Sequence, residues 1–246
     1  MNAIGIIPAR MASTRFPGKP LAKINGVPML GHVYTRSKLS SSLSAVYIAT
    51  CDDAIRVYAK SIGAPCIMTA DTHQRASDRA AEATLTIEQM IGERVDIVML
   101  IQGDEPMLQP RMLDQAVQPL TQDAGLNIVN LMAETAPTDA ENPNVVKVVT
   151  DVNDDALYFS REGIPSLKMA SSFVPARKQL GLIAFRRDYL IKYIALAPTP
   201  LEVIESVDML RVLEHGDRVR MVLTEYCSVG VDTPEDLARV ESLMAD

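Results

Sequence analysis

The N-terminal part of the chain alternates between short apolar segments that suit buried strands and longer segments with helical spacing. Strands are predicted at 3–8, 45–50, 65–69 and 96–101, and helices at 28–39, 53–62 and 77–91, with Ser77 as a helix cap. This alternation favours a sheet of parallel strands joined by crossover helices. The segment 96–101 is almost entirely apolar, which is typical of a strand covered on both faces. We therefore expect an α/β protein.

The second half follows a different pattern. Strands are predicted at 127–132, 145–150, 156–160, 180–186 and 218–224, and helices at 201–215 and 234–244. The strands at 145–150 and 156–160 are separated by a turn-like acidic segment, so they are expected to form a hairpin. The segment 162–177 is rich in Gly, Pro and Ser and is predicted to be a long loop, mobile or in contact with a partner.

Size and composition exclude several classes of protein. The chain has 246 residues, 48% of them hydrophobic, which suffices for one large domain or for a domain with a smaller lobe. No apolar run approaches the roughly 20 residues that span a bilayer, and no signal peptide is recognisable, so we expect a cytoplasmic protein. The three cysteines, Cys51, Cys66 and Cys227, are too scattered for a zinc cluster or a disulfide framework.

Charge is distributed unevenly along the chain. The net charge is −7, yet residues 1–51 contain six basic residues and no acidic one, which leaves 18 basic against 31 acidic residues in the rest. An acidic protein with one cationic segment indicates a local anion site, whereas a nucleic-acid-binding protein would show a broad basic surface. We therefore expect no nucleic-acid partner.

The cationic segment and an acidic residue fall at strand ends. The loop from Pro8 to Lys19 follows the first strand, and Asp104 follows the strand at 96–101. In open α/β sheets, ligands bind beyond the carboxyl ends of the strands, so the loop and Asp104 can meet there. The loop offers small residues and three cations, Arg10, Arg15 and Lys19, but it is neither a P-loop nor a dinucleotide-binding motif. It predicts a phosphate site or, alternatively, an ordinary exposed basic turn.

Asp104 makes a metal site the stronger hypothesis. A carboxylate at the end of a buried strand is costly unless it is hydrated, paired or bound to a cation. Mg²⁺ suits such a place, because it takes one or two carboxylates together with phosphate oxygens of the substrate. Asp232 is the best second ligand, since it ends a predicted short strand; the alternative is that it caps the helix that begins at Pro234.

Several longer segments resemble one enzyme family. The segments IIPARMASTRFPGKPLAKINGVPML, QGDEPM, NPNVVKVV, ALYFSREGIP and GVDTPEDLARV are similar to those of the CMP-Kdo synthetases (3-deoxy-manno-octulosonate cytidylyltransferases). They occur in the family order and nearly from end to end of the chain. The resemblance implies a nucleotidyltransferase fold related to glycosyltransferase A domains, with a mixed, mainly parallel sheet flanked by helices and a smaller sugar-binding and dimerisation lobe. It also implies a homodimer.

The resemblance also implies a reaction: transfer of CMP from CTP to the anomeric hydroxyl of a 3-deoxy-2-keto sugar acid, with release of pyrophosphate. Within one domain, residues 1–132 would mainly bind the nucleotide, 133–225 would bind the sugar and the second subunit, and 226–246 would return to the metal site. Asp104 and Asp232 would bind Mg²⁺. The implied nucleotide-binding residues are Pro8, Ala9, Arg10, Ser13, Arg15, Lys19, Arg75, Ala76 and Arg79.

The implied sugar-binding residues are Gln102, Arg161, Gln179, Ile183 and Asp208, and here the chain departs from the family pattern. The family commonly has His and Tyr where this chain has Gln179 and Ile183, a Glu-Gln pair in place of Asp208-Met209, and a small residue in place of Arg75. Losing a hydrogen bond to the substrate can change selectivity by orders of magnitude. The differences therefore predict an altered sugar acid, with neutral drift as the alternative.

Three functions remain open from the sequence. The first is a Mg²⁺-dependent cytidylyltransferase for Kdo or a close relative, which would serve lipopolysaccharide or capsule synthesis. The second is a paralogue that activates another ulosonic acid. The third is a nucleotide-binding regulatory protein without turnover, against which the retained Arg10, Arg15, Lys19, Asp104 and Asp232 argue.

Overall fold

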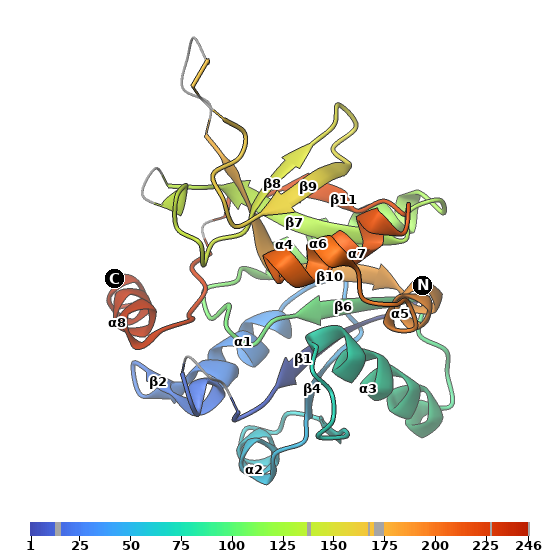
Figure 1. Cartoon of the computed structure of the whole chain (residues 1–246). Helices are drawn as coiled ribbons and strands as arrows, with labels where there is room; N and C mark the ends of the chain where they lie inside the picture. The colour runs from blue at the N-terminus through green and yellow to red at the C-terminus, as the bar shows by residue number, and fades with distance from the viewer. Residues whose placement is uncertain (13–15, 137–138, 167, 170–174, 227, 246) are drawn as a thin grey trace.

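A mixed sheet forms the centre of the molecule (Figure 1). The computed structural model describes residues 1–12, 16–136, 139–166, 168–169, 175–226 and 228–245. Within that part of the chain, the sheet has the strand order β11-β7-β10-β6-β1-β4-β5. These strands are β1 (Ala3–Ala9), β4 (Ala45–Thr50), β5 (Cys66–Met68), β6 (Ile97–Ile101), β7 (Ile128–Glu134), β10 (Arg177–Arg186) and β11 (Arg220–Leu223).

Strand direction confirms the predicted mainly parallel α/β architecture. β1 is parallel to β4 and β6, and β5 is parallel to β4. β10 is antiparallel to both of its neighbours, β6 and β7, while β11 is parallel to β7. β10 alone among these strands is therefore reversed, and the others share one direction.

Helices cover both faces of the sheet. The helices are α1 (Met29–Ser37), α2 (Asp53–Ser61), α3 (Ala76–Ile91), α4 (Pro110–Gln122), α5 (Arg187–Ile194), α6 (Pro200–Glu205), α7 (Met209–Glu214) and α8 (Pro234–Leu243). One apolar core contains buried residues of α1, α2 and α4, and a second contains buried residues of α3, α5 and α7. Burial on both faces explains the continuous apolar sequence of β6.

A hairpin extends the sheet beside β10. β8 (Lys147–Thr150) pairs antiparallel with β9 (Ala156–Ser160) and with the start of β10. The predicted hairpin is confirmed, and Figure 1 shows it in the upper part of the molecule, away from β4. A separate two-stranded sheet, β2 (Lys23–Ile24) with β3 (Val27–Pro28), follows a short 3-10 helix at Lys19–Leu21.

Two predictions about helices were wrong. The helix predicted at 201–215 is two helices, α6 and α7, because Ser206 takes a left-handed conformation with a φ of 53° and ends α6. α3 begins at Ala76, with Arg75 and not Ser77 at the N-cap position. The sequence reading also missed α4 and α5. Both helix corrections bear on the site, since the altered segments face it.

The C-terminal segment returns to the N-terminal half. The strand predicted to end at Asp232 is absent among the described residues 228–232, and Thr233 caps α8 with its side chain. The alternative reading of Asp232 as the cap is therefore wrong, and Asp232 lies one residue before the cap. α8 packs with Val231 against Ile24 and Met29, and Figure 1 shows it near β2.

Candidate active site

Neighbouring strand ends bring the basic loop and the acidic turn together. Ile6 of β1 pairs with Leu100 of β6, so the segments that follow these strands leave the same edge of the sheet. The C-terminal segment joins them, because the backbone N–H of Val231 donates to the carbonyl oxygen of Asp104 at 2.9 Å. Three parts of the chain that are distant in sequence thus meet at Asp104.

Lys19 connects the two acids that the sequence singles out. Its ammonium group donates to Asp104 Oδ2 at 2.8 Å and to Asp232 Oδ1 at 3.3 Å. It also donates to the carbonyl oxygen of Val231 at 2.9 Å. Burial by itself would lower the pKa of Lys19, but the charges and hydrogen bonds of Asp104 and Asp232 outweigh burial and raise the pKa. Lys19 therefore remains a cation between two carboxylates.

The position of Lys19 depends on a turn that only glycine adopts easily. Gly18 has a φ of 74°, in the left-handed region, and precedes the 3-10 helix that begins at Lys19 with Pro20 as its second residue. The Gly18 amide donates to the carbonyl oxygen of Met11 at 3.1 Å, so these two residues lie side by side. The segment Phe-Pro-Gly-Lys, residues 16–19, thus places the ammonium group of Lys19 in the site.

The donor set fits a hard divalent cation. Asp104 and Asp232 already share one positive charge, that of Lys19, so the pair is arranged for a cation. In the described part of the chain, no three His, Cys, Asp or Glu side chains are grouped to hold a metal between them. Two carboxylates completed by phosphate oxygens and water match the preference of Mg²⁺ rather than that of Zn²⁺ or Ca²⁺.

A cavity of about 670 Å³, here the loop cavity, lies beside this cluster. It is lined by predicted nucleotide-binding residues: Pro8, Ala9, Arg10, Lys19, Arg75, Ala76 and Arg79. Ser13 and Arg15 lie outside the described residues. Arg79 is 3% exposed and donates through Nη1 to Thr69 Oγ1 and to the carbonyl oxygen of Ala70, whereas its buried Nη2 has no partner among the described residues. An anionic ligand could satisfy that donor.

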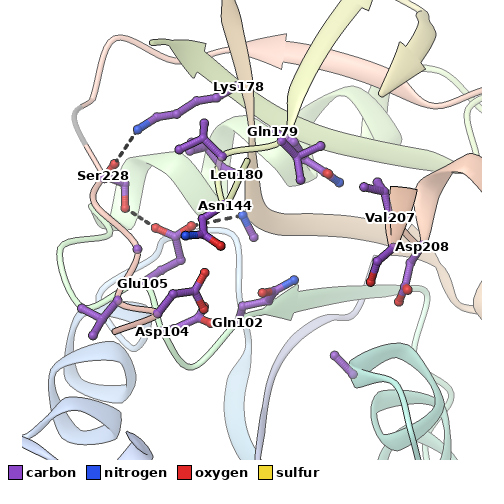
Figure 2. A pocket seen from close by; sticks show the side chains of 18 of the residues that line it. Gln102, Asp104, Glu105, Asn144, Lys178, Gln179, Leu180, Val207, Asp208 and Ser228 are labelled. Carbon is purple, nitrogen blue, oxygen red and sulfur yellow. Dashed lines mark hydrogen bonds between the residues drawn. The ribbon is translucent and has the colours of Figure 1, made fainter. Parts of the chain in front are cut away.

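A second cavity of about 610 Å³, here the β10 cavity, adjoins the first, and both are lined by Gln102 and Asp104. All five predicted sugar-binding residues line it: Gln102, Arg161, Gln179, Ile183 and Asp208. Figure 2 shows Asp104 and Glu105 on one side of this cavity and Asp208 on the other. The fold therefore brings the predicted residues into two joined cavities with Asp104 at their border.

Comparison with known proteins shows the family of this chain. The family described as cytidylyltransferase matches residues 4–221. The 3-deoxy-manno-octulosonate cytidylyltransferase of Geobacter metallireducens is 43% identical over 251 residues, which cover 98% of this chain and 96% of that protein. That of Solibacter usitatus is 45% identical, covering 98% and 93%. The chain belongs to the 3-deoxy-manno-octulosonate cytidylyltransferase family.

A solved structure supports the same family. The chain superimposes with a TM-score of 0.90 on a CMP:2-keto-3-deoxy-manno-octonic acid synthetase complexed with CTP. The two are 36% identical, and the match covers 100% of this chain and 99% of the other. The α/β nucleotidyltransferase fold expected from the cytidylyltransferase resemblance is thus confirmed.

Within this cytidylyltransferase, a backbone irregularity fixes Gln179. The pairing of β10 with β7 shifts register between Gln179 and Ile183. Buried Asn130 fills the gap by donating to the carbonyl oxygens of Leu180 at 2.8 Å and Leu182 at 3.1 Å. Gln179 Nε2 donates to Asn130 Oδ1 at 2.6 Å, so this hydrogen bond fixes the side-chain amide of Gln179. Ile183 is 4% exposed and belongs mainly to the core.

Close packing fixes Gln102. Its backbone N–H donates to the carbonyl oxygen of Gly181 at 2.9 Å. A Cβ atom at Gly181 would lie 2.9 Å from Cβ and 3.0 Å from Cγ and Cδ of Gln102. Glycine is therefore required at 181 for β10 to approach the Gln102 side chain this closely.

The guanidinium group of Arg161 donates hydrogen bonds to three backbone carbonyl oxygens. Nε donates to the carbonyl oxygen of Glu205 at 2.6 Å, Nη1 to that of Pro143 at 2.8 Å and Nη2 to that of Ser206 at 3.1 Å. Arg161 thus joins β9 to the α6–α7 junction. Arg161 lines the β10 cavity, but its guanidinium donors bind backbone carbonyls, so its contact with a sugar acid stays a prediction.

The sequence analysis missed one residue of the β10 cavity, Glu105, and one buried residue that binds the wall of that cavity, Lys147. Glu105 is buried, accepts from the Gly181 amide at 3.1 Å and from Ser228 Oγ, and its burial raises its pKa (Figure 2). Lys147 is fully buried and donates to the carbonyl oxygens of Asn142 at 2.9 Å and Val145 at 2.8 Å. The QGDEPM and NPNVVKVV segments contain them, but only their burial reveals their role in holding the walls.

Proposed function

We propose that this protein transfers CMP from CTP to the anomeric hydroxyl of a 3-deoxy-2-keto sugar acid and releases pyrophosphate. The observation that carries the proposal is the border between the two cavities. Gln102 and Asp104 line both of them, so ligands in the two cavities would meet at Asp104. The names of the relatives supply the substrate class, 3-deoxy-manno-octulosonate (Kdo).

In this proposal the loop cavity takes CTP. Pro8 and Ala9 line the base pocket, and Arg10, Lys19 and Arg79 offer positive charge or buried N–H donors to the phosphates. Ser13 and Arg15 belong to the same proposed set. Asp104 and Asp232 would hold Mg²⁺, and Lys19, which contacts both carboxylates, would offer its positive charge beside the phosphates.

The chemistry needs positioning and charge more than a covalent intermediate. Phosphoryl-type transfer depends on alignment of the reactants and on neutralisation of the developing charge. Mg²⁺, when bound, would acidify the sugar hydroxyl and neutralise the α-phosphate. Lys19 and Arg10 would stabilise the leaving pyrophosphate, and Asp104 would hold the metal.

The β10 cavity takes the sugar acid, with Gln102, Arg161, Gln179, Ile183 and Asp208 on its walls. Kdo is the first candidate because of the relatives' names. A different ulosonic acid is the second, because Gln179 is held by Asn130, Ile183 offers no polar group and Arg75 pairs with Asp208 on the cavity wall. These features support a changed set of sugar contacts.

The cellular setting follows from the same proposal. The product would feed lipopolysaccharide or capsule synthesis, and we propose a cytoplasmic homodimer. Residues 1–132 would mainly bind the nucleotide, 133–225 the sugar and the second subunit, and 226–246 would complete the metal site. No helix in the described residues is long and apolar enough to cross a membrane.

Pyrophosphate release tests the function directly. The purified protein is mixed with CTP, Mg²⁺ and each member of a panel of 3-deoxy-2-keto sugar acids that includes Kdo. Release with Kdo supports the first candidate, and release only with another acid supports the second. Tight CTP binding without release from any acid would contradict the proposal and favour a regulatory nucleotide-binding protein.

A further inference from the structure

Arg75 crosses from one half of the site to the other. It is the N-cap residue of α3, and its backbone is extended, with a φ of −114° and a ψ of 152°. Its Nη2 lies 2.6 Å from Glu202 Oε1 on α6, and its Nε lies 3.7 Å from Asp208 Oδ1 at the start of α7. The side chain therefore links the wall of the loop cavity to the α6–α7 segment.

The far end of this link is rigid. The Glu202 side chain is 3% exposed, and Arg211 binds it through Nε to Oε2 and Nη2 to Oε1, both at 2.8 Å. The backbone N–H of Thr199 donates to the same carboxylate at 3.2 Å. Two guanidinium groups and an amide thus fix one buried carboxylate, which leaves Glu202 little freedom to move away from Arg75.

The link holds a specific part of the wall. Residues 206–208 join α6 to α7, and together with Met209, the first residue of α7, they line the β10 cavity. Arg161 holds this segment from β9 through the carbonyl oxygens of Glu205 and Ser206, and Arg75 holds it from α3 through Glu202 and Asp208. Asp208 remains 42% exposed, and Figure 2 shows it on the cavity wall beside Val207.

We propose that Arg75 is a positioning residue that sets the specificity for the sugar acid. It fixes the 206–209 wall so that the Asp208 carboxylate is held ready to accept a hydrogen bond from a substituent of the sugar, and it acts without binding the CTP phosphates. This inference rests on the proposed function. It gives a structural reason for a bulky cation at the position where the family pattern has a small residue.

Substitution of Arg75 separates this role from nucleotide binding. Arg75→Ser removes the link, so we expect the KM for the preferred sugar acid to rise about tenfold, the order of effect of one lost polar contact. The Kd of CTP, measured by calorimetry, should change less than about twofold, since no phosphate contact is lost. Arg75→Lys keeps a cation and should recover part of the lost affinity.

Arg187 provides a matched control. Its side chain is 22% exposed, against 24% for Arg75, and it pairs with Glu88 at 2.7 Å, with neither residue lining either cavity. Arg187→Ser should lower Tm and leave the KM for the sugar acid and the KM for CTP unchanged. A second variant, Asp208→Asn, should raise the KM for the sugar acid even if Arg75→Ser fails to fold.

The outcomes are distinct. A rise in the Kd of CTP of about tenfold or more in Arg75→Ser would overturn the inference, because Arg75 would then bind the nucleotide. An unchanged KM for the sugar acid in folded Arg75→Ser and Asp208→Asn would also overturn it, while turnover by the natural chain left the proposed function standing. If the natural chain turns over no sugar acid, the proposed function fails and the inference fails with it.

Discussion

The two ion clusters of the active site differ in burial more than in composition. At the border of the cavities, Lys19 lies between Asp104 and Asp232, whose side chains are 25% and 29% exposed. At the far wall, Arg75 lies between Glu202 and Asp208, and Glu202 is only 3% exposed. In each cluster one cation joins two acids that are distant from that cation in the sequence.

This difference in burial means that a bound cation can be exchanged at Asp104 and Asp232, whereas the cluster at Glu202 has a structural role. Water can reach Asp104 and Asp232, so an incoming cation can replace Lys19 without leaving a carboxylate dry and unpaired. Glu202 and Arg211 are both almost fully buried, so separating this pair would leave a buried charge without a partner at a cost of several kcal/mol. The first cluster is therefore suited to binding and the second to holding shape.

The largest effect is expected from Asp104→Asn, which tests whether the Lys19 cluster binds a metal. The change removes one proposed metal ligand and keeps the side-chain shape, so kcat should fall by about 10³-fold or more while the fold persists. Pyrophosphate release measures the loss, and circular dichroism with a thermal melt checks the fold. Asp188→Asn, at an exposed ion pair with Arg94, is the control. Substantial turnover by a folded Asp104→Asn variant would remove Asp104 from the metal site.

Glu202→Gln tests the structural role of the buried cluster around Glu202. It leaves the buried Arg211 without its counter-charge, so the free energy of unfolding should fall by about 3 to 5 kcal/mol. Urea denaturation measures the change. Lys19→Met, at the better-hydrated cluster, should lower the free energy of unfolding by only about 1 kcal/mol or less. Equal losses in the two variants would mean that burial does not distinguish the clusters.

Gly181→Ala tests the close packing of β10 against the Gln102 side chain. The added Cβ atom would lie 2.9 Å from Gln102 Cβ, so Gln102 must move at the border of the cavities. We expect kcat/KM to fall about 10- to 100-fold, as for a displacement near 1 Å of a positioning residue. Gly163→Ala, where the nearest atom is 3.6 Å away, is the control in the same assay. Unchanged kcat/KM in Gly181→Ala would show that Gln102 has no positioning role.

The smallest effect is expected at Glu88, outside the site. Burial by itself would raise the pKa of Glu88, but Arg187 and the Val95 amide lower it below the ordinary value. A lowered pKa in the folded state means that the carboxylate stabilises the fold at neutral pH and that this contribution is lost as pH falls below about 4.5. Glu88→Gln should therefore lower the free energy of unfolding by roughly 1 kcal/mol or less at pH 7. Urea titrations should show this difference shrinking in acid; a constant difference from pH 7 to 4 would contradict it.

Sequence reasoning succeeded where local pattern carries the information. The apolar run before Asp104 predicts a buried strand, and β6 covers Ile97–Ile101. The position of Asp104 and of the basic loop at strand ends predicts that they meet, and Lys19 contacts Asp104. The helix predicted at 201–215 failed because its periodicity continues through Ser206, whose left-handed conformation has no apolar signature.

The sequence by itself determined the alternation of strands and helices, the strand-end acid and the cationic loop, because periodicity and charge are local properties of a chain. Only the tertiary structure decided which partners these residues have. Lys19 joins Asp104 to Asp232, and Arg75 reaches Glu202, through contacts between segments that no local pattern relates. Burial, which the packing of the whole chain sets, then makes the first of these clusters open to exchange and the second a fixed part of the wall.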